Sequence, residues 1–140
     1  MLTNFNINSD FSVSYEGHYF DLHNNFDFVG YDYDIAARRL TLTWVKSADE
    51  WAKSEKFSKI EFIHLGVYFF KSSLNEAVTE ISSDDQCLEG MSFIPAVDKD
   101  SDDIFFIDQP QPIDGDVIMY AFVTDRFMRV GCDEIEVIAK

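Results

Sequence analysis

Residues 26–45 read FDFVGYDYDIAARRLTLTWV, and this stretch decides the fold class. Aromatic and polar side chains alternate in its first half, which is the two-residue period of a strand with one buried face. Gly30 interrupts that alternation and predicts a β-bulge. Residues 39–45 alternate again, with Thr, Leu, Trp and Val. Two alternating runs separated by a short connection predict a β-hairpin with a loop of four or five residues.

The same period continues on both sides of this hairpin. Further strands are expected at residues 11–15, 59–70 with a bend at Gly66, 88–94, 117–123, 127–130 and 135–138, beside an apolar run at 104–107. Residues 47–58 are polar and predict a loop or one helical turn. Residues 73–81 place apolar side chains at i, i+3, i+4 and i+7, with Ser73 and Glu76 as a capping box, which predicts a helix.

This pattern predicts a β-dominated α+β fold in a single domain over residues 1–140. We expect a curled antiparallel sheet or sandwich of about eight strands, with one or two short helices. The 140 residues are 46% hydrophobic and 16% aromatic, with fourteen Phe, which excludes a disordered chain.

Charge is distributed unevenly along the chain, whose net charge is -15. Residues 72–125 carry thirteen carboxylates and one lysine, Lys99, whereas residues 35–71 carry seven basic residues against four acids. Because phosphates would be repelled by such a chain, nucleic acid is excluded as a partner. The acidic segment indicates a partner or an ion of positive charge.

No apolar run approaches the roughly 20 residues that span a bilayer, and the N-terminal residues lack the features of a secretory signal. We therefore expect no membrane association and a cytoplasmic protein. Cys87 and Cys132 are expected to be reduced thiols without chemistry of their own.

The segment from Asp98 to Asp103 spaces its carboxylates at positions one, three and five, as a calcium-binding loop does. The sixth position is Asp103 where the turn needs glycine, and the twelfth is Gln109 where a bidentate Glu is expected. A solvated acidic turn is therefore the prediction, with no metal.

The three histidines, His18, His23 and His64, have no metal-ligand spacing. The chain also contains no nucleophile elbow, phosphate-binding glycine loop or dinucleotide fingerprint. We expect no catalytic residue and no cofactor. The paired acids Asp32 and Asp34 are interpreted as the wet face of a strand.

The runs DLHNNFDFVGYDYDIAARRLTLTWV, KIEFIHLGVYFF and VIMYAFVTDRFMRVGCDEIEVI resemble small bacterial β-rich immunity proteins associated with polymorphic toxins. The resemblance includes an Arg-x-Leu-x-Leu strand and an acidic closing pair of strands. The matching positions are His23, Arg38, Leu40, Leu42, Phe62, Val67 and Asp133-Glu134-Ile135. Asn24 departs from the pattern, in which an acid follows the histidine.

The resemblance implies a non-catalytic protein that neutralises a basic toxin such as a nuclease, which agrees with the charge. The expected partner-binding residues are Asp98, Asp100, Asp102, Asp103, Asp108, Asp114 and Asp116, with Phe105 or Tyr120 as an aromatic anchor. The alternative is a small-molecule-binding or enzymatic domain with an aromatic-lined pocket, in which His18 or His23 supplies polar chemistry. Strand edges that are rich in aromatic residues are also compatible with a homodimer.

Overall fold

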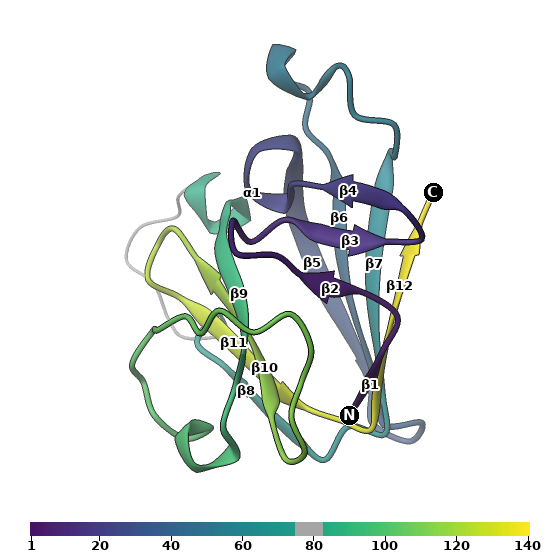
Figure 1. The fold of residues 1–140 in the computed structure, drawn as a ribbon. Helices are drawn as coiled ribbons and strands as arrows, with labels where there is room; N and C mark the ends of the chain where they lie inside the picture. The colour runs from purple at the N-terminus through teal and green to yellow at the C-terminus, as the bar shows by residue number, and fades with distance from the viewer. Residues whose placement is uncertain (75–82) are drawn as a thin grey trace.

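The computed structural model describes residues 1–74 and 83–140 and is dominated by β-strands (Figure 1). In this part of the chain twelve strands form three sheets. The five-stranded sheet contains, in spatial order, β1 (Leu2–Thr3), β12 (Glu134–Ala139), β7 (Lys59–Leu65), β6 (Arg39–Lys46) and β5 (Phe26–Asp34). The four-stranded sheet contains β8 (Phe69–Ser72), β11 (Phe127–Gly131), β10 (Val117–Phe122) and β9 (Leu88–Ile94). The three-stranded sheet contains β2 (Asn6–Ile7), β3 (Val13–Tyr15) and β4 (His18–Phe20).

The helical elements are short and lie in the connections. They are α1 (Leu22–Asn25) and the 3-10 turns η1 (Glu50–Ala52), η2 (Ser83–Gln86) and η3 (Ala96–Asp98). In the described residues, no helix has the length and apolar character to cross a membrane. The β-dominated class with few short helices is therefore confirmed. The chain has more strands than the pattern indicated, because the N-terminal segment adds pairs only two or three residues long.

The hairpin of β5 and β6 confirms the prediction from residues 26–45. Asp34 lies opposite Arg39, so the connection is the four residues 35–38. The register shifts between Phe28 and Gly30, which is the expected bulge. Alternation places Leu40, Leu42 and Trp44 completely inside the protein.

Residues 59–70 form two strands in two different sheets, and the prediction of one long bent strand is wrong. The chain leaves the five-stranded sheet after Leu65 and enters the four-stranded sheet at Phe69. Gly66 turns the chain with a φ of 65°, and a Cβ there would collide with the carboxylate of Asp133. This left-handed position and the close approach both require glycine.

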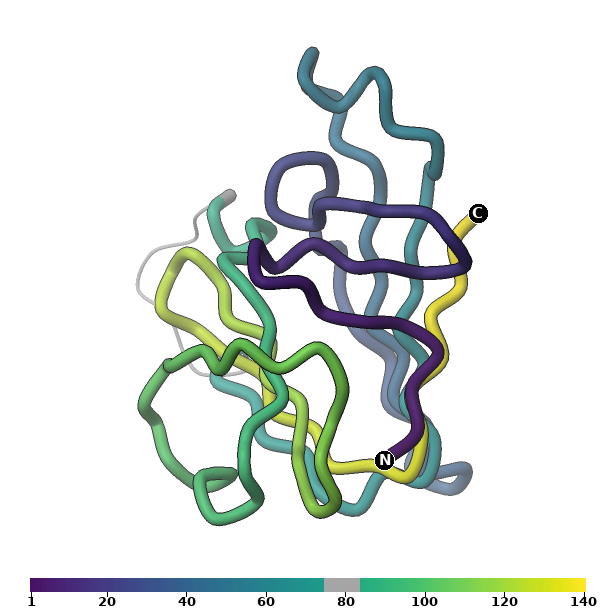
Figure 2. Tube along the Cα trace, viewed as in Figure 1, coloured from purple at the N-terminus to yellow at the C-terminus, as the bar shows by residue number. Residues whose placement is uncertain are grey.

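The main hydrophobic core lies between the sheets and includes buried residues of all three. Aromatic rings fill its centre, where Phe62 contacts Trp44 and Tyr120 at centroid distances of 5.4 and 5.9 Å. The three-stranded sheet covers one side of this core with Ile7, Val13 and Phe20. Figure 2 shows this N-terminal segment crossing in front of the longer strands, after the N-terminus has passed beside β12.

A second, smaller core lies on the outer face of the four-stranded sheet. There Ile94, Val117 and Met119 are buried beneath residues 104–107. These four residues form no strand, although the apolar run resembled one; they cover the sheet instead. The predicted helix over 73–81 falls mainly on residues 75–82, which lie outside the described part of the chain. The prediction for 47–58 is confirmed by η1 and its flanking loops, whereas α1 was not predicted.

Candidate partner-binding surface

The acidic residues predicted to bind a partner lie on one excursion of the chain, residues 95–116. It leaves the four-stranded sheet at the end of β9 and returns at the start of β10, where Ile94 and Val117 are cross-strand partners. The turn beginning at Asp98 and the turn at 114–116 are therefore adjacent to the same end of this sheet. Figure 1 shows the excursion as a broad loop beside the sheet, with η3 and the start of β10 at the same end.

A row of side chains, one from each strand, lies on the outer face of this sheet and supports the excursion. Arg129 of β11 pairs with Lys71 of β8 on one side and with Met119 of β10 on the other. Met119 in turn pairs with Ser92 of β9. Because cross-strand partners point to the same face, these four side chains form one line beneath the loop.

Arg129 is fully buried, and its side chain binds backbone carbonyl groups of the loop. One terminal nitrogen donates to the carbonyl oxygens of Asp98 and Lys99 at 3.1 and 3.3 Å, and the other donates to the carbonyl oxygen of Asp103. The guanidinium also lies over the ring of Phe127, 4.7 Å from its centroid. Three carbonyls from both ends of the turn thus converge on one buried cation.

The electrostatics of Arg129 reflect two opposing causes. Burial lowers the pKa of its guanidinium, whereas the carboxylates of the loop act in the opposite direction. Its Nε has no hydrogen-bond partner in the described part of the chain. Since the acids of the loop favour the charged form, the arginine and the acidic turn stabilise each other.

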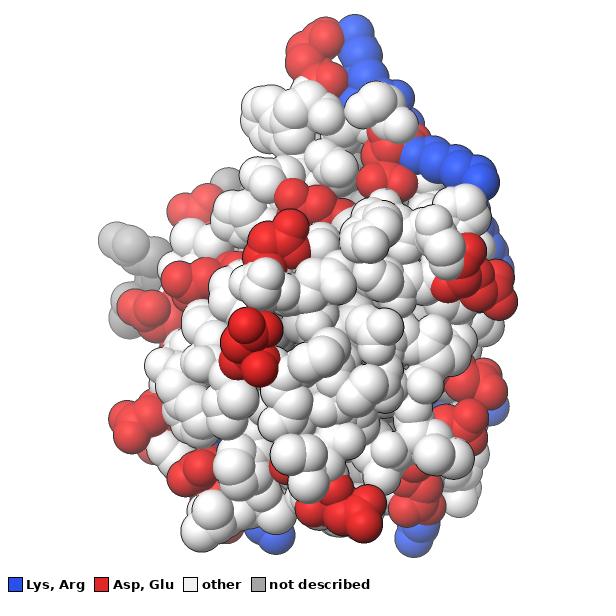
Figure 3. Space-filling view, in the orientation of Figure 1, with Lys and Arg blue, Asp and Glu red and all other residues white. Residues whose placement is uncertain are grey.

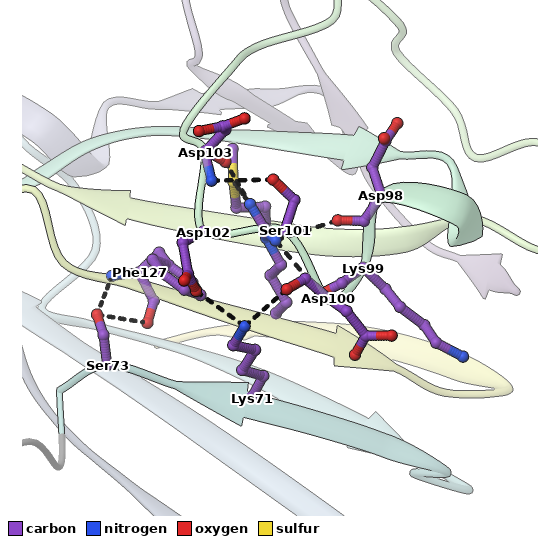
Figure 4. Close-up of polar contacts among 11 residues, drawn as sticks. Lys71, Ser73, Asp98, Lys99, Asp100, Ser101, Asp102, Asp103 and Phe127 are labelled. Carbon is purple, nitrogen blue, oxygen red and sulfur yellow. Dashed lines mark hydrogen bonds and ion pairs between the residues drawn. The ribbon is translucent and has the colours of Figure 1, made fainter.

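Lys71 makes the second basic contact with the turn (Figure 4). Its Nζ donates to the carbonyl oxygen of Asp100 at 2.8 Å and to Oδ1 of Asp102 at 2.9 Å. This hydrogen bond and the charge of Lys71 lower the pKa of the Asp102 carboxyl. Among the described residues, Asp102 is therefore the carboxylate of the turn that forms an ion pair.

The other carboxylates of the turn point away from the buried arginine and from one another. Figure 4 shows those of Asp98, Asp100 and Asp103 directed outward in different directions. A calcium ion needs six to eight oxygen ligands around one point, and these side chains do not converge. Among the residues that the structure describes, no group of His, Cys, Asp and Glu could hold a metal ion.

The remaining predicted residues divide between the surface and the interior of the excursion. Asp108 and Asp114 are exposed. Asp116 is buried, and its Oδ2 accepts hydrogen bonds from Gln109 Nε2 and from the backbone N–H of Ile113. Phe105 is half-buried against the small core, and Tyr120 is completely buried. The surface that a partner could reach therefore consists mainly of Asp98, Asp100, Asp103, Asp108 and Asp114.

Ser92 fastens the second half of the excursion to the sheet. Its hydroxyl oxygen accepts a 2.9 Å hydrogen bond from the backbone N–H of Ile107. Next to it, the ring of Phe106 occupies the space that a Cβ at Gly90 would need, 2.9 Å from its nearest ring atom. The ring also contacts Phe11 at a centroid distance of 4.7 Å. Hydrogen bonding and apolar packing thus attach the second half of the excursion to the sheet.

We expect Ser92→Ala to lower the free energy of unfolding by about 1 to 2 kcal/mol, because it leaves the Ile107 N–H without its acceptor. Urea denaturation measures this change. Ser58→Ala is the matched control, since it removes an exposed hydroxyl that donates to the Lys140 carbonyl oxygen. Equal losses in the two variants would show that Ser92 does not anchor the loop.

The role of Arg129 was not predicted, although the sequence contains a signal for it. Arg129 is the only charged residue between Phe127 and Cys132, in a strand that is otherwise apolar. A lone arginine in a buried strand indicates a buried polar contact. Its partners could not be named from the sequence, because they are backbone carbonyls about 30 residues away in the chain.

Basic side chains do not gather into one surface. Arg39 begins β6 and Lys46 ends it, so the basic residues near each lie at opposite ends of this strand. Figure 3 shows acidic side chains around much of the visible face and basic ones mainly near its edges. The basic residues of 35–71 therefore do not form one positively charged surface.

The structure also places His18 and the two cysteines that the sequence analysis considered. His18 meets the ring of Phe57 edge-on at 5.2 Å. Cys132 is buried, which raises the pKa of its thiol to about 12, and neither it nor Cys87 forms a disulfide.

No protein-family model, curated protein or solved structure matches this chain.

Proposed function

We propose that this chain is a non-catalytic acidic binding protein with a basic protein as its partner, acting as an immunity factor in a bacterial cytoplasm. In this proposal it neutralises a toxin such as a nuclease by occupying the toxin's active surface. The observation that carries the proposal is the anchored acidic loop, in which Arg129 holds the backbone of residues 98–103 while most carboxylates point to solvent.

Anchoring matters because a binding loop that is already ordered loses less conformational entropy on association. Arg129, Lys71 and Ser92 fix the excursion at three points along its length. A partner would therefore meet carboxylates whose positions are already set. Such pre-organisation is expected of an inhibitor that must bind tightly without rearranging.

Charge supports the same proposal. The side chains of Asp100, Asp103, Asp108 and Asp114 are exposed and form no ion pair with a lysine or arginine of the described chain. Carboxylates placed in this way attract a basic surface and steer its approach, which raises association rates by roughly 10 to 1000-fold. They also resemble the phosphates that a nuclease surface binds.

The proposal is tested by neutralising these four carboxylates together, as Asp100→Asn, Asp103→Asn, Asp108→Asn and Asp114→Asn. The matched control removes the same charge elsewhere, through Glu16→Gln, Asp32→Asn, Glu89→Gln and Asp125→Asn. All four control residues are exposed acids outside residues 95–116. Partners are captured from the source lysate at about 0.1 M salt, identified by mass spectrometry and then purified.

We expect a basic protein that binds the wild type and the control but binds the loop variant at least about 10-fold more weakly. An equimolar amount of wild type should also inhibit the nuclease activity of that protein. Equal binding by both variants would place the interface elsewhere. Recovery of no basic protein by the wild type would contradict the proposed function itself.

A further inference from the structure

A pocket of about 450 Å³ shares none of its lining residues with the acidic excursion, residues 95–116. It adjoins Cys87, which precedes the start of β9, whereas the acidic excursion follows the end of β9. Four parts of the chain form its walls, namely α1, the beginning of β5, the loop that carries η1, and η2. The two sites are therefore separate and can be tested separately.

Trp51 provides a large aromatic wall of this pocket. Its side chain is 64% exposed, yet its indole N–H donates a 2.5 Å hydrogen bond to the carbonyl oxygen of Asn24. The ring is therefore held in place while one face stays open to solvent. An exposed tryptophan fixed in this way offers a flat surface on which a planar or cationic group can stack.

The polar part of the lining is negative. Asp27, Asp49 and Asp84 line the pocket, and none of the described residues that line it is a lysine or arginine. Asp27 is half-buried, and its carboxylate makes no hydrogen bond or ion pair with the described residues. Asp49 is positioned by the Ser47 hydroxyl, which donates to its Oδ2 at 2.8 Å.

The Cys87 thiol lies in a negatively charged part of the pocket. Burial raises its pKa, and the charges of Asp84 and Asp27 raise it further. The Nδ1 atom of His23 is not free to bind a ligand, because it donates a hydrogen bond to the carbonyl oxygen of Leu88 at 2.6 Å. An aromatic wall and negative charge thus meet in one concave site.

We propose that this pocket binds a guanidinium or ammonium group carried on an apolar stem. The charged group lies beside Asp27 and Asp49, and the ligand packs on the ring of Trp51 through its stem or through the cation itself. Cations over tryptophan are stabilised by the ring quadrupole, and arginine also stacks on it. The group belongs to a small diffusible ligand or to a side chain of a bound protein, since both carry the same chemistry.

The test uses the natural contrast between the two tryptophans. Trp44 is fully buried and Trp51 is exposed, so a change in acrylamide quenching reports on Trp51. The probes are agmatine for a free ligand, N-acetylarginine amide for a protein side chain, and N-acetylcitrulline amide as the neutral isostere of the latter. Calorimetry with the same probes gives affinities that do not depend on fluorescence.

We expect saturable binding of agmatine or of the arginine amide, with a Kd below about 1 mM, and at least about 10-fold weaker binding of the citrulline amide. Tighter binding of agmatine indicates a free ligand, and tighter binding of the arginine amide indicates a side chain. Asp27→Asn and Asp49→Asn should each weaken binding several-fold, and Trp51→Leu should weaken it in calorimetry.

The fourfold loop variant described above is the control that should bind these probes like the wild type. Circular dichroism and urea denaturation of each pocket variant establish that it is folded. Equal affinity for the arginine and citrulline amides, or no saturable binding of either cationic probe, would overturn the proposal. Neither result would affect the proposed role of the acidic loop.

Discussion

Replacement of Arg129 with methionine is expected to lower the free energy of unfolding by about 3 kcal/mol and to release residues 98–103 from the sheet. The guanidinium donates to three backbone carbonyls of this turn, and methionine can replace none of these hydrogen bonds. The loss is partly offset, because the buried charge and its unpartnered Nε no longer need to be removed from water.

Urea denaturation measures the stability of this variant, and limited proteolysis measures the release of the turn. Lys71→Met is the matched control, since it removes a cation from the same row that is only half-buried. It should destabilise the protein much less, because exposed ion pairs contribute little. If the Arg129 variant kept both its stability and its resistance to protease, the arginine would not be what anchors the acidic surface.

Acidification is expected to remove about 3 kcal/mol of stability through His64. The imidazole is fully buried: its Nδ1–H donates to the Leu40 carbonyl oxygen at 2.9 Å, and its Nε2 accepts from the Tyr120 hydroxyl at 2.8 Å. Burial lowers the pKa of His64 from 6.5 to about 4. Protonation would place a charge between the two sheets and turn the Nε2 acceptor into a donor facing the Tyr120 O–H.

The sign follows from the two pKa values. Between about pH 4 and 6.5 the histidine binds a proton in the unfolded chain but not in the folded one. Its contribution is therefore complete above pH 6.5 and is lost as the pH falls toward 4, at about 1.4 kcal/mol per pH unit. Protonation of surface carboxylates below pH 5 relieves repulsion and acts in the opposite direction, so the contribution must be measured as a difference.

Urea denaturation from pH 7 to pH 5 gives this difference between wild type and His64→Gln. Averaged over this range, the slope of stability against pH should be lower in the variant by about 1 kcal/mol per unit, because the unfolded histidine is only partly protonated above pH 6. The same substitution at His23, an exposed residue, controls for the change of residue type. A slope that did not depend on His64 would mean that the imidazole is protonated in the folded protein or is not buried.

Local sequence patterns predicted the parts of this fold that depend on near neighbours. The hairpin of β5 and β6, its bulge at Gly30 and its four-residue loop all follow from alternation and turn chemistry within 20 residues. Residues 104–107 show where the pattern was insufficient, because a short apolar run is equally suited to a strand or to a cover over another sheet. The small core formed with Ile94 and Val117 decided between the two.

The acidic segment shows the same division for the candidate site. Its charge and the break in its calcium-like spacing were both visible in the sequence. The direction of the carboxylates was not, because it depends on backbone carbonyls that bind Arg129. Similarly, the pocket beside Trp51 joins residues from Asp27 to Cys87, and no local pattern connects them.

The sequence alone determined a β-dominated class, the main hairpin and the excess of acid between residues 72 and 125, because each depends on composition or on a short-range period. Only the tertiary structure decided that Gly66 sends the chain into a second sheet, that His64 lies buried between sheets, and that Arg129 organises the acidic loop. These features arise from contacts between residues far apart in the chain, whose free energy depends on burial and geometry that the order of residues does not display.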